Sequence, residues 1–187
     1  MYGENMRIIS GIHKGRRIER VGIKTTRETA DMVKEAVFQM LPSQDNAIVL
    51  DLFAGSGAYA FEALSRGAKH AYLSDYNKKA IFTIRKNANT LNVEDKVDIL
   101  FRSYDKMLKK VKDVQFDTIF IDPPYAFKHY KELLIDLSLI TKIYGLVVVE
   151  TEKKTHLDDI YNDLIKIKEK TYGIKRIHIY KKNAKEI

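Results

Sequence analysis

The strongest constraint on the fold is an alternation between short apolar runs and longer segments of helical periodicity, which extends from residue 47 to residue 150. Apolar runs rich in β-branched residues are typical of strands buried on both faces of a parallel sheet. Consecutive parallel strands need a crossover, usually a right-handed helical one. The sequence therefore predicts an α/β fold with a doubly wound sheet. The expected strands are 47–53, 70–75, 97–101, 116–122 and 144–150, and the expected helices are 57–66, 77–91, 104–111 and 127–139.

Both ends of the chain depart from this alternation. We expect a small β-hairpin over residues 6–23 and a helix over 29–41. After the last expected parallel strand, we expect a helix near 155–162 and then strands over 164–171 and 174–181. The turn between these two strands is too short for a crossover, so one of them must run antiparallel.

Composition excludes several classes of site. The 187 residues include no cysteine, which excludes disulfides and thiolate chemistry and permits a reducing cytoplasm. The five histidines lack the spacing of metal ligands, so we expect no metal. No apolar run approaches the roughly 20 residues of a membrane span, and the N-terminus lacks a signal-peptide core. We therefore expect a cytoplasmic protein without membrane contact.

Positive charge gathers at the two ends of the chain. The net charge is +8, yet residues 28–165 are net acidic, whereas residues 1–27 carry seven basic and two acidic side chains and residues 166–187 carry eight and two. Basic surfaces attract phosphate backbones and gain affinity by releasing counterions. Taken alone, the basic ends of the chain are also explained if they only keep the protein in solution.

A glycine loop joins the first expected strand to its helix. Gly55 and Gly57 allow a tight turn and close approach of a ligand, and with Ala60 they match the G-x-G-x-x-A fingerprint. Asp75 follows Gly55 by 20 residues, at a strand end where a carboxylate grips ribose hydroxyls. Asp51 ends an apolar strand before the loop, and a buried carboxylate there needs a partner such as a cofactor ammonium. These residues predict an adenosine-bearing cofactor and leave NAD and S-adenosylmethionine open.

The sharpest chemical signal is the segment Asp122-Pro123-Pro124-Tyr125 at the end of an apolar strand. Proline cannot donate to a sheet ladder, so the pair ends the strand and stiffens the exit. The Asp122 carboxylate and the Pro123 carbonyl offer two acceptors for the protons of an exocyclic amine, whose lone pair then points at a methyl donor. Asp122 would also take up a proton late in the step. Tyr125 offers a stacking face for a base flipped into the site.

Two residues near this expected site have two interpretations each. Tyr76 is either an aromatic that packs on an adenine ring or an ordinary half-buried side chain. Glu150 ends a strand at the same edge of the sheet, where it is either a side chain that reaches the site or a capped, solvated acid, and we expect the second.

The chain resembles the class I amino-group methyltransferases and, more narrowly, the RsmD-type bacterial 16S rRNA guanine-N2 methyltransferases. The resemblance covers nearly the whole length. It is carried by MRIISGIHKGRRI, TRETADMVKEAVFQML, VLDLFAGSGAYAFEALSRGA, FDTIFIDPPY and VVVE.

The resemblance implies a Rossmann-like, seven-stranded, mostly parallel sheet with one antiparallel strand and an N-terminal β-hairpin extension. It divides the chain into a basic extension, 1–27, and a catalytic domain, 28–187. It implies S-adenosylmethionine as donor, S-adenosylhomocysteine as product, and one guanine of 16S rRNA in the small ribosomal subunit as target, the family target being guanine 966. We expect a monomer. The implied catalytic residues are Asp122, Pro123, Pro124 and Tyr125. The implied donor-site residues are Asp51, Phe53, Ala54, Gly55, Ser56, Gly57, Asp75, Tyr76 and Ser103. The implied RNA contacts are Arg7, Lys14, Arg16, Arg17 and Arg27.

The chain departs from the family pattern in two places. Glu28 stands where the family has proline, which puts the shape of the helix entry in doubt. Residues 102–105 replace the usual adenine-binding strand end, with Ser103 as the positional match and Asp105 as the nearest acid. Three alternatives remain at this point: an adenine-N6 methyltransferase acting on DNA or RNA, an NAD(P)-dependent oxidoreductase, and a non-catalytic RNA-binding protein.

Overall fold

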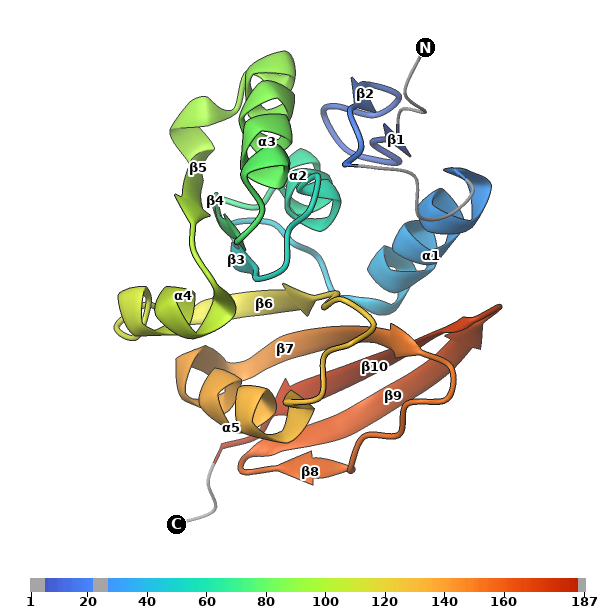
Figure 1. The fold of residues 1–187 in the computed structure, drawn as a ribbon, viewed down its shortest axis with the longest axis vertical. Coiled ribbons are helices and arrows are strands. Elements are labelled where there is room, and N and C mark those ends of the chain that lie inside the picture. Colours follow the sequence, from blue (N-terminus) through green and yellow to red (C-terminus); the bar gives the residue numbers. More distant parts are fainter. Residues whose placement is uncertain (1–5, 22–26, 185–187) are drawn as a thin grey trace.

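The computed structural model describes residues 6–21 and 27–184, without the side chains of 27–30. The described residues form a central sheet with the strand order β5-β4-β3-β6-β7-β10-β9-β8 (Figure 1). Neighbouring strands from β5 to β7 run parallel, and β10 lies antiparallel between β7 and β9. The strand bounds are β3 Ile48–Asp51, β4 His70–Asp75, β5 Val97–Phe101, β6 Phe116–Ile121, β7 Thr141–Glu152, β8 Ile160–Tyr161, β9 Leu164–Tyr172 and β10 Lys175–Lys182.

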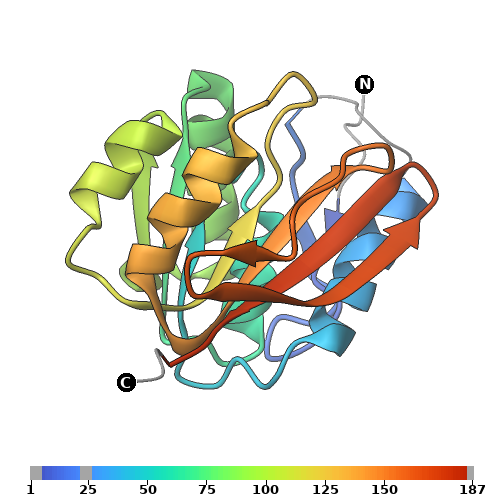
Figure 2. The ribbon, with the colours of Figure 1, turned by 90° about the horizontal axis from the view of Figure 1, so that it is seen from below.

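Helices cover both faces of this sheet, as Figure 2 shows from a second direction. One buried apolar cluster joins the sheet to α1, α2, α3 and the N-terminal hairpin, and a second joins the opposite face to α4 and α5. The bounds are α1 Arg27–Met40, α2 Ala58–Ser65, α3 Lys78–Leu91, α4 Tyr104–Lys110 and α5 Tyr130–Ile140, with a 3-10 turn over Glu94–Lys96. The predicted α/β fold class is confirmed: all seven predicted sheet strands are present, with β10 as the antiparallel one, and the short β8 adds an eighth strand in the described residues.

The predicted helix near 155–162 is wrong. This segment is a loop followed by the two-residue strand β8, which pairs antiparallel with β9. Leu157, Tyr161 and Leu164 have helical spacing in the sequence and are all buried, which explains the prediction. However, Asn162 adopts a left-handed backbone (φ 54°) that turns β8 into β9, and the backbone N–H of Asp158 donates to the Tyr161 hydroxyl over 2.9 Å. These turn interactions take backbone groups that a helix would have used.

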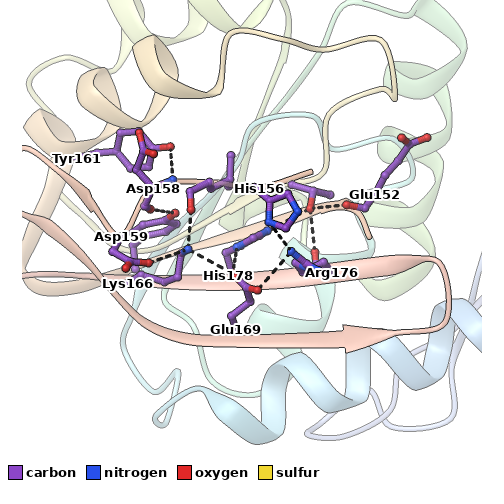
Figure 3. A network of polar contacts seen from close by, with 12 residues as sticks. Glu152, His156, Asp158, Asp159, Tyr161, Lys166, Glu169, Arg176 and His178 are labelled. Carbon is purple, nitrogen blue, oxygen red and sulfur yellow. Dashed lines mark hydrogen bonds and ion pairs between the residues drawn. The ribbon is translucent and has the colours of Figure 1, made fainter. Parts of the chain in front are cut away.

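Figure 3 shows the polar network that lies between this loop and the outer strands. His178 on β10 is fully buried, with Nδ1 3.1 Å from a Glu169 carboxylate oxygen and Nε2 3.2 Å from the Thr151 hydroxyl. The Lys166 ammonium reaches Asp159 in the loop and Glu169 on its own strand. The loop is therefore attached to the sheet by charges as well as by apolar contacts.

The N-terminal hairpin is present as β1 Met6–Arg7 and β2 Arg17–Ile18. Its loop is held by Glu62 on α2, a fully buried carboxylate that accepts hydrogen bonds from the backbone N–H groups of Ile9 and Ser10. The Lys34 ammonium, also buried, lies 3.3 Å from Glu62 and donates to the Arg7 carbonyl. Charge-assisted bonds to a buried carboxylate are strong, so the hairpin is held firmly against α1 and α2. The division at residue 27 stays a prediction.

Candidate active site

A cleft of about 580 Å³ opens at the carboxyl ends of β3, β4, β6 and β7. In a doubly wound sheet this edge is where ligands bind. The cleft is lined by eleven of the predicted residues: Asp51, Phe53, Ala54, Gly55, Ser56, Asp75, Tyr76, Asp122, Pro123, Pro124 and Tyr125. The glycine loop and the proline corner, about 70 residues apart in sequence, therefore share one site.

The two glycines of the loop have different structural roles. Gly55 has a φ of 54° and lines the cleft, and a Cβ there would meet no atom within 4 Å. Gly57 has a φ of 78° and does not line the cleft, and a Cβ there would lie 2.5 Å from the Phe61 ring and 3.0 Å from Leu73. Gly55 therefore keeps the backbone open towards a ligand, whereas Gly57 lets α2 pack closely on the sheet.

Asp75 is held in position by two backbone groups. One carboxylate oxygen accepts from the Gly55 N–H and the other from the Asn77 N–H, each over 2.9 Å. A carboxylate has about four acceptor positions, so both oxygens keep capacity for hydroxyl donors in the cleft. This geometry suits the two hydroxyls of a ribose. Tyr76 beside it is 62% exposed, which leaves its ring face available to a ligand.

Asp51 is a buried carboxylate, 3% exposed, at the floor of the cleft. Burial raises the pKa of Asp51 to about 7, the charges of Asp122 and Asp75 add to the rise, and the Ala60 N–H, 3.3 Å away, opposes it. A single long hydrogen bond leaves this group poorly compensated. Its environment therefore favours a cationic partner.

The segment after β6 forms a rigid corner. The Phe127 N–H donates to the Pro124 carbonyl over 2.8 Å and closes the turn. Pro123 is buried, the Asp122 side chain is 46% exposed and the Tyr125 ring is 58% exposed. The corner thus presents a carboxylate and an aromatic face to the cleft.

An aromatic cluster that the sequence analysis did not predict supports this corner. Phe127 packs edge-on against Phe53, Tyr104 and Tyr130, with ring centroids 5.0–5.4 Å apart. Burial raises the pKa of Tyr130 to about 12, and the charges of Asp122 and Glu152 contribute. The Tyr130 hydroxyl therefore stays protonated beside the corner.

Glu150 contradicts its expected role as a solvated acid. It is 4% exposed, accepts a hydrogen bond from the Tyr59 hydroxyl over 2.8 Å and forms an ion pair with Lys175. Both Glu150 and Lys175 line the cleft. Burial raises the pKa of Tyr59 well above its usual value, with contributions from Asp122 and Asp51.

The hairpin and α1 also line the cleft, through Met6, Arg20, Val21, Val33 and Lys34. From its sequence the hairpin was expected to contact RNA alone, so its contribution to the cleft was not predicted. Nothing in the local sequence signals it, because Met6, Arg20 and Val21 reach the cleft through the docking of the hairpin, and Val33 and Lys34 through the packing of α1.

The remaining predicted residues lie elsewhere. Ser103 precedes α4 outside the cleft lining, and its hydroxyl bonds to Asp105 and lowers the pKa of that acid. The Arg16 guanidinium donates to the carbonyls of Thr90 and Leu91 at the end of α3, so it has a structural partner within the fold. Among the predicted RNA contacts, the exposed side chains are Arg7, Lys14 and Arg17. The Arg27 side chain lies outside the described residues.

Residues 6–21 and 27–184 contain neither a cluster of metal ligands nor a membrane-spanning helix. No group of three or more His, Asp or Glu side chains there is arranged to hold a metal ion. No helix in the same ranges is long and apolar enough to cross a membrane.

The sheet order and the position of the cleft define a Rossmann-like α/β fold of the class I methyltransferase type. Residues 6–181 match the family described as Conserved hypothetical protein 95, and the chain belongs to this family. Together with relatives named "Ribosomal RNA small subunit methyltransferase D", this match confirms the resemblance to RsmD-type proteins.

Individual relatives cover almost the whole chain. The chain is 38% identical over 184 residues to the "Putative rRNA methyltransferase YlbH" of Bacillus subtilis strain 168, which covers 96% of this chain and 100% of that relative. It is 34% identical to the "Ribosomal RNA small subunit methyltransferase D" of Haemophilus influenzae, over 94% and 93% of the two chains. The solved structure of the "Putative methyltransferase yhhF" from Escherichia coli superposes with a TM-score of 0.86 at 27% identity, covering 97% of this chain and 100% of that one.

Proposed function

We propose that this protein transfers a methyl group from S-adenosylmethionine to the exocyclic N2 amine of a guanine in 16S rRNA of the small ribosomal subunit, with guanine 966 as the family target. The observation that carries the proposal is that Asp122 and Tyr125 line the same cleft as Gly55 and Asp75. An oxidoreductase that used this glycine loop would have no role for the proline corner. A non-catalytic RNA-binding protein would need neither the glycine loop nor the proline corner.

The residues of the cleft fit S-adenosylmethionine. Asp75 presents two fixed oxygens to ribose hydroxyls, Tyr76 offers a ring face to adenine, and Gly55 leaves the backbone open. Asp51 supplies the buried negative charge that the donor's ammonium would compensate. When bound, the donor supplies an electrophilic methyl group on a sulfonium.

The proline corner acts on the other reactant. The Asp122 carboxylate and the Pro123 carbonyl accept hydrogen bonds from the two N–H groups of the target amine, so its nitrogen lone pair is directed at the methyl carbon. As the nitrogen–carbon bond forms and the carbon–sulfur bond breaks, the amine loses a proton, which Asp122 accepts. Tyr125 stacks on the base that has left its helix.

The assignment of the substrate rests on the family and on charge. Relatives of this chain are named as methyltransferases of the small-subunit rRNA. We propose that residues 1–27 form a basic extension that contacts the RNA, with Arg7, Lys14 and Arg17 as its described exposed cations, and that residues 28–187 form the catalytic domain. We further propose that the protein acts as a monomer in the cytoplasm.

The test offers labelled donor with small ribosomal subunits, free 16S rRNA and duplex DNA, followed by nucleoside analysis. The expected product is N2-methylguanosine. Asp122→Ala should lower transfer by at least about 100-fold and leave S-adenosylhomocysteine binding unchanged. Asp113→Asn, at an exposed acid before the opposite end of β6, is the matched control and should be fully active. N6-methyladenosine as the product would refute the guanine assignment.

A further inference from the structure

The cleft contains four carboxylates and a lysine that bridges two of them. Asp51, Asp75, Asp122 and Glu150 all line it. The Lys175 ammonium forms an ion pair with Glu150 and lies 3.9 Å from a carboxylate oxygen of Asp122. Lys175 is 14% exposed and Glu150 is 4% exposed, so solvent screens their ion pair weakly, whereas the contact of Lys175 with the 46% exposed Asp122 is screened more strongly.

Lys175 reaches this position because of the strand that carries it. It is the first residue of β10, which runs antiparallel to β7, so the beginning of β10 lies at the carboxyl end of β7. In the register of this pair, Lys175 lies opposite Glu152, and Ile177 lies opposite Glu150. The lysine side chain therefore extends diagonally to Glu150 and towards the corner after β6.

Glu150 is itself held in place. The Tyr59 hydroxyl donates to it over 2.8 Å, and the Tyr59 ring stacks on Phe120 with centroids 5.1 Å apart. Phe120 belongs to β6, the strand that leads into Asp122. Side chains from α2, β7 and β10 thus form a continuous chain of polar contacts that ends at the Asp122 carboxylate.

We infer that Lys175 is a positioning residue for methyl transfer: anchored by Glu150 and Tyr59, it holds Asp122 ionised and oriented towards the target amine. This inference rests on the proposed role of Asp122. A protonated Asp122 would offer a donor where the amine needs an acceptor, so its charge decides whether the corner works. Carboxylates that share a site repel one another, and one of them gains a proton unless a cation lies among them.

The groups that surround Asp122 come from several elements. The cations that line the cleft with Asp122 are Lys175 on β10, Arg20 after β2, Lys34 on α1 and Lys79 on α3, and Lys175 lies 3.9 Å from the Asp122 carboxylate. The acids and hydroxyls are Asp51 on β3, Asp75 on β4, Tyr59 on α2, Tyr130 on α5 and Glu150 on β7. Both tyrosines have raised pKa values and stay neutral at neutral pH. The repulsion that Lys175 helps to offset therefore comes from the carboxylates Asp51, Asp75 and Glu150.

The experiment measures kcat and KM for methyl transfer to small ribosomal subunits between pH 5 and 9. Lys175→Met, which removes the charge and keeps the shape, should raise the pH of the acidic limb of kcat by about one unit. It should change S-adenosylhomocysteine binding by less than about twofold, which also shows that the variant is folded. Lys175→Arg should restore most of the wild-type profile. Lys154→Met is the matched control, because Lys154 pairs with the neighbouring Glu152 at an exposed position, and its profile should not move.

A double variant separates charge balance from simple packing. Lys175→Met with Glu150→Gln removes both partners of the ion pair, so the acidic limb should return towards the wild-type position. An unchanged acidic limb in Lys175→Met would overturn the inference, as would equal losses in the methionine and arginine variants. If Asp122→Asn itself remained fully active, the role of the Asp122 charge would fail and with it that of Lys175, whereas the proposed function would fail if the wild-type protein formed no N2-methylguanosine. If Asp122→Asn were inactive while Lys175→Met behaved as wild type, only the role of Lys175 would fail.

Discussion

Asp51 allows a quantitative prediction about donor binding. Its pKa is about 7 because it is buried beside other acids, so in the free protein it is half protonated at neutral pH. If it must be ionised to hold the ammonium of S-adenosylhomocysteine, the apparent Kd carries the factor 1 + 10^(pKa − pH). This factor is about 11 at pH 6 and about 1.1 at pH 8, so binding should weaken roughly tenfold on lowering the pH, or by about 1.4 kcal/mol.

The assay is isothermal titration calorimetry with S-adenosylhomocysteine at pH 6, 7 and 8, in two buffers of different ionisation enthalpy. At pH 6, binding to the wild-type protein should release close to one proton. Asp51→Asn keeps the shape of the side chain and removes its titration, so its Kd should be weaker at pH 8 and should lack the Asp51-dependent tenfold change. Titration of the ligand itself cancels in this comparison. Identical pH dependence in the two proteins would refute the role of Asp51 as the ammonium partner.

Three further predictions concern stability and RNA binding. Burial lowers the pKa of His178 (Figure 3) to about 4, so below about pH 6.5 the unfolded state binds the proton more readily than the folded state. The free energy of unfolding in urea should therefore fall by about 2 kcal/mol between pH 7.5 and 5, and His178→Gln should lose that component. An equal pH dependence in the two proteins would contradict this prediction. Gly57→Ala should destabilise the fold by about 2 kcal/mol or more, because the added Cβ would collide with Phe61. Gly55→Ala should cost less stability and should mainly weaken donor binding. Thermal unfolding measures the first effect and calorimetry the second, and equal stabilities of the two variants would contradict the packing argument. The double variant Arg7→Glu with Arg17→Glu should bind 16S rRNA at least about tenfold more weakly, and its RNA affinity should depend less on salt concentration. Its affinity for the donor should not change. An unaltered RNA affinity would refute the role of the hairpin.

The sequence alone determined the parts of the site that follow from local chemistry. The strand before Asp51, the glycine loop and the corner that begins at Asp122 were predictable, because each is a strand end with its own composition. The carboxyl ends of parallel strands meet at one edge of a sheet, so predicting the strands also predicted that these segments would meet. The false helix near 155–162 shows the limit of periodicity: buried side chains at helical spacing occur equally in a loop and hairpin when a residue such as Asn162 turns the chain.

Only the tertiary structure decided which distant side chains complete the cleft. Glu150 and Lys175 form their ion pair because β10 runs antiparallel to β7 in a particular register, and no local pattern specifies that register. Arg16 is held at the end of α3, and the hairpin reaches the cleft, because Glu62 fixes the hairpin on α2. These contacts join residues 25 or more positions apart. Their formation depends on how the elements pack against one another, whereas strand ends and turns depend on neighbouring residues alone.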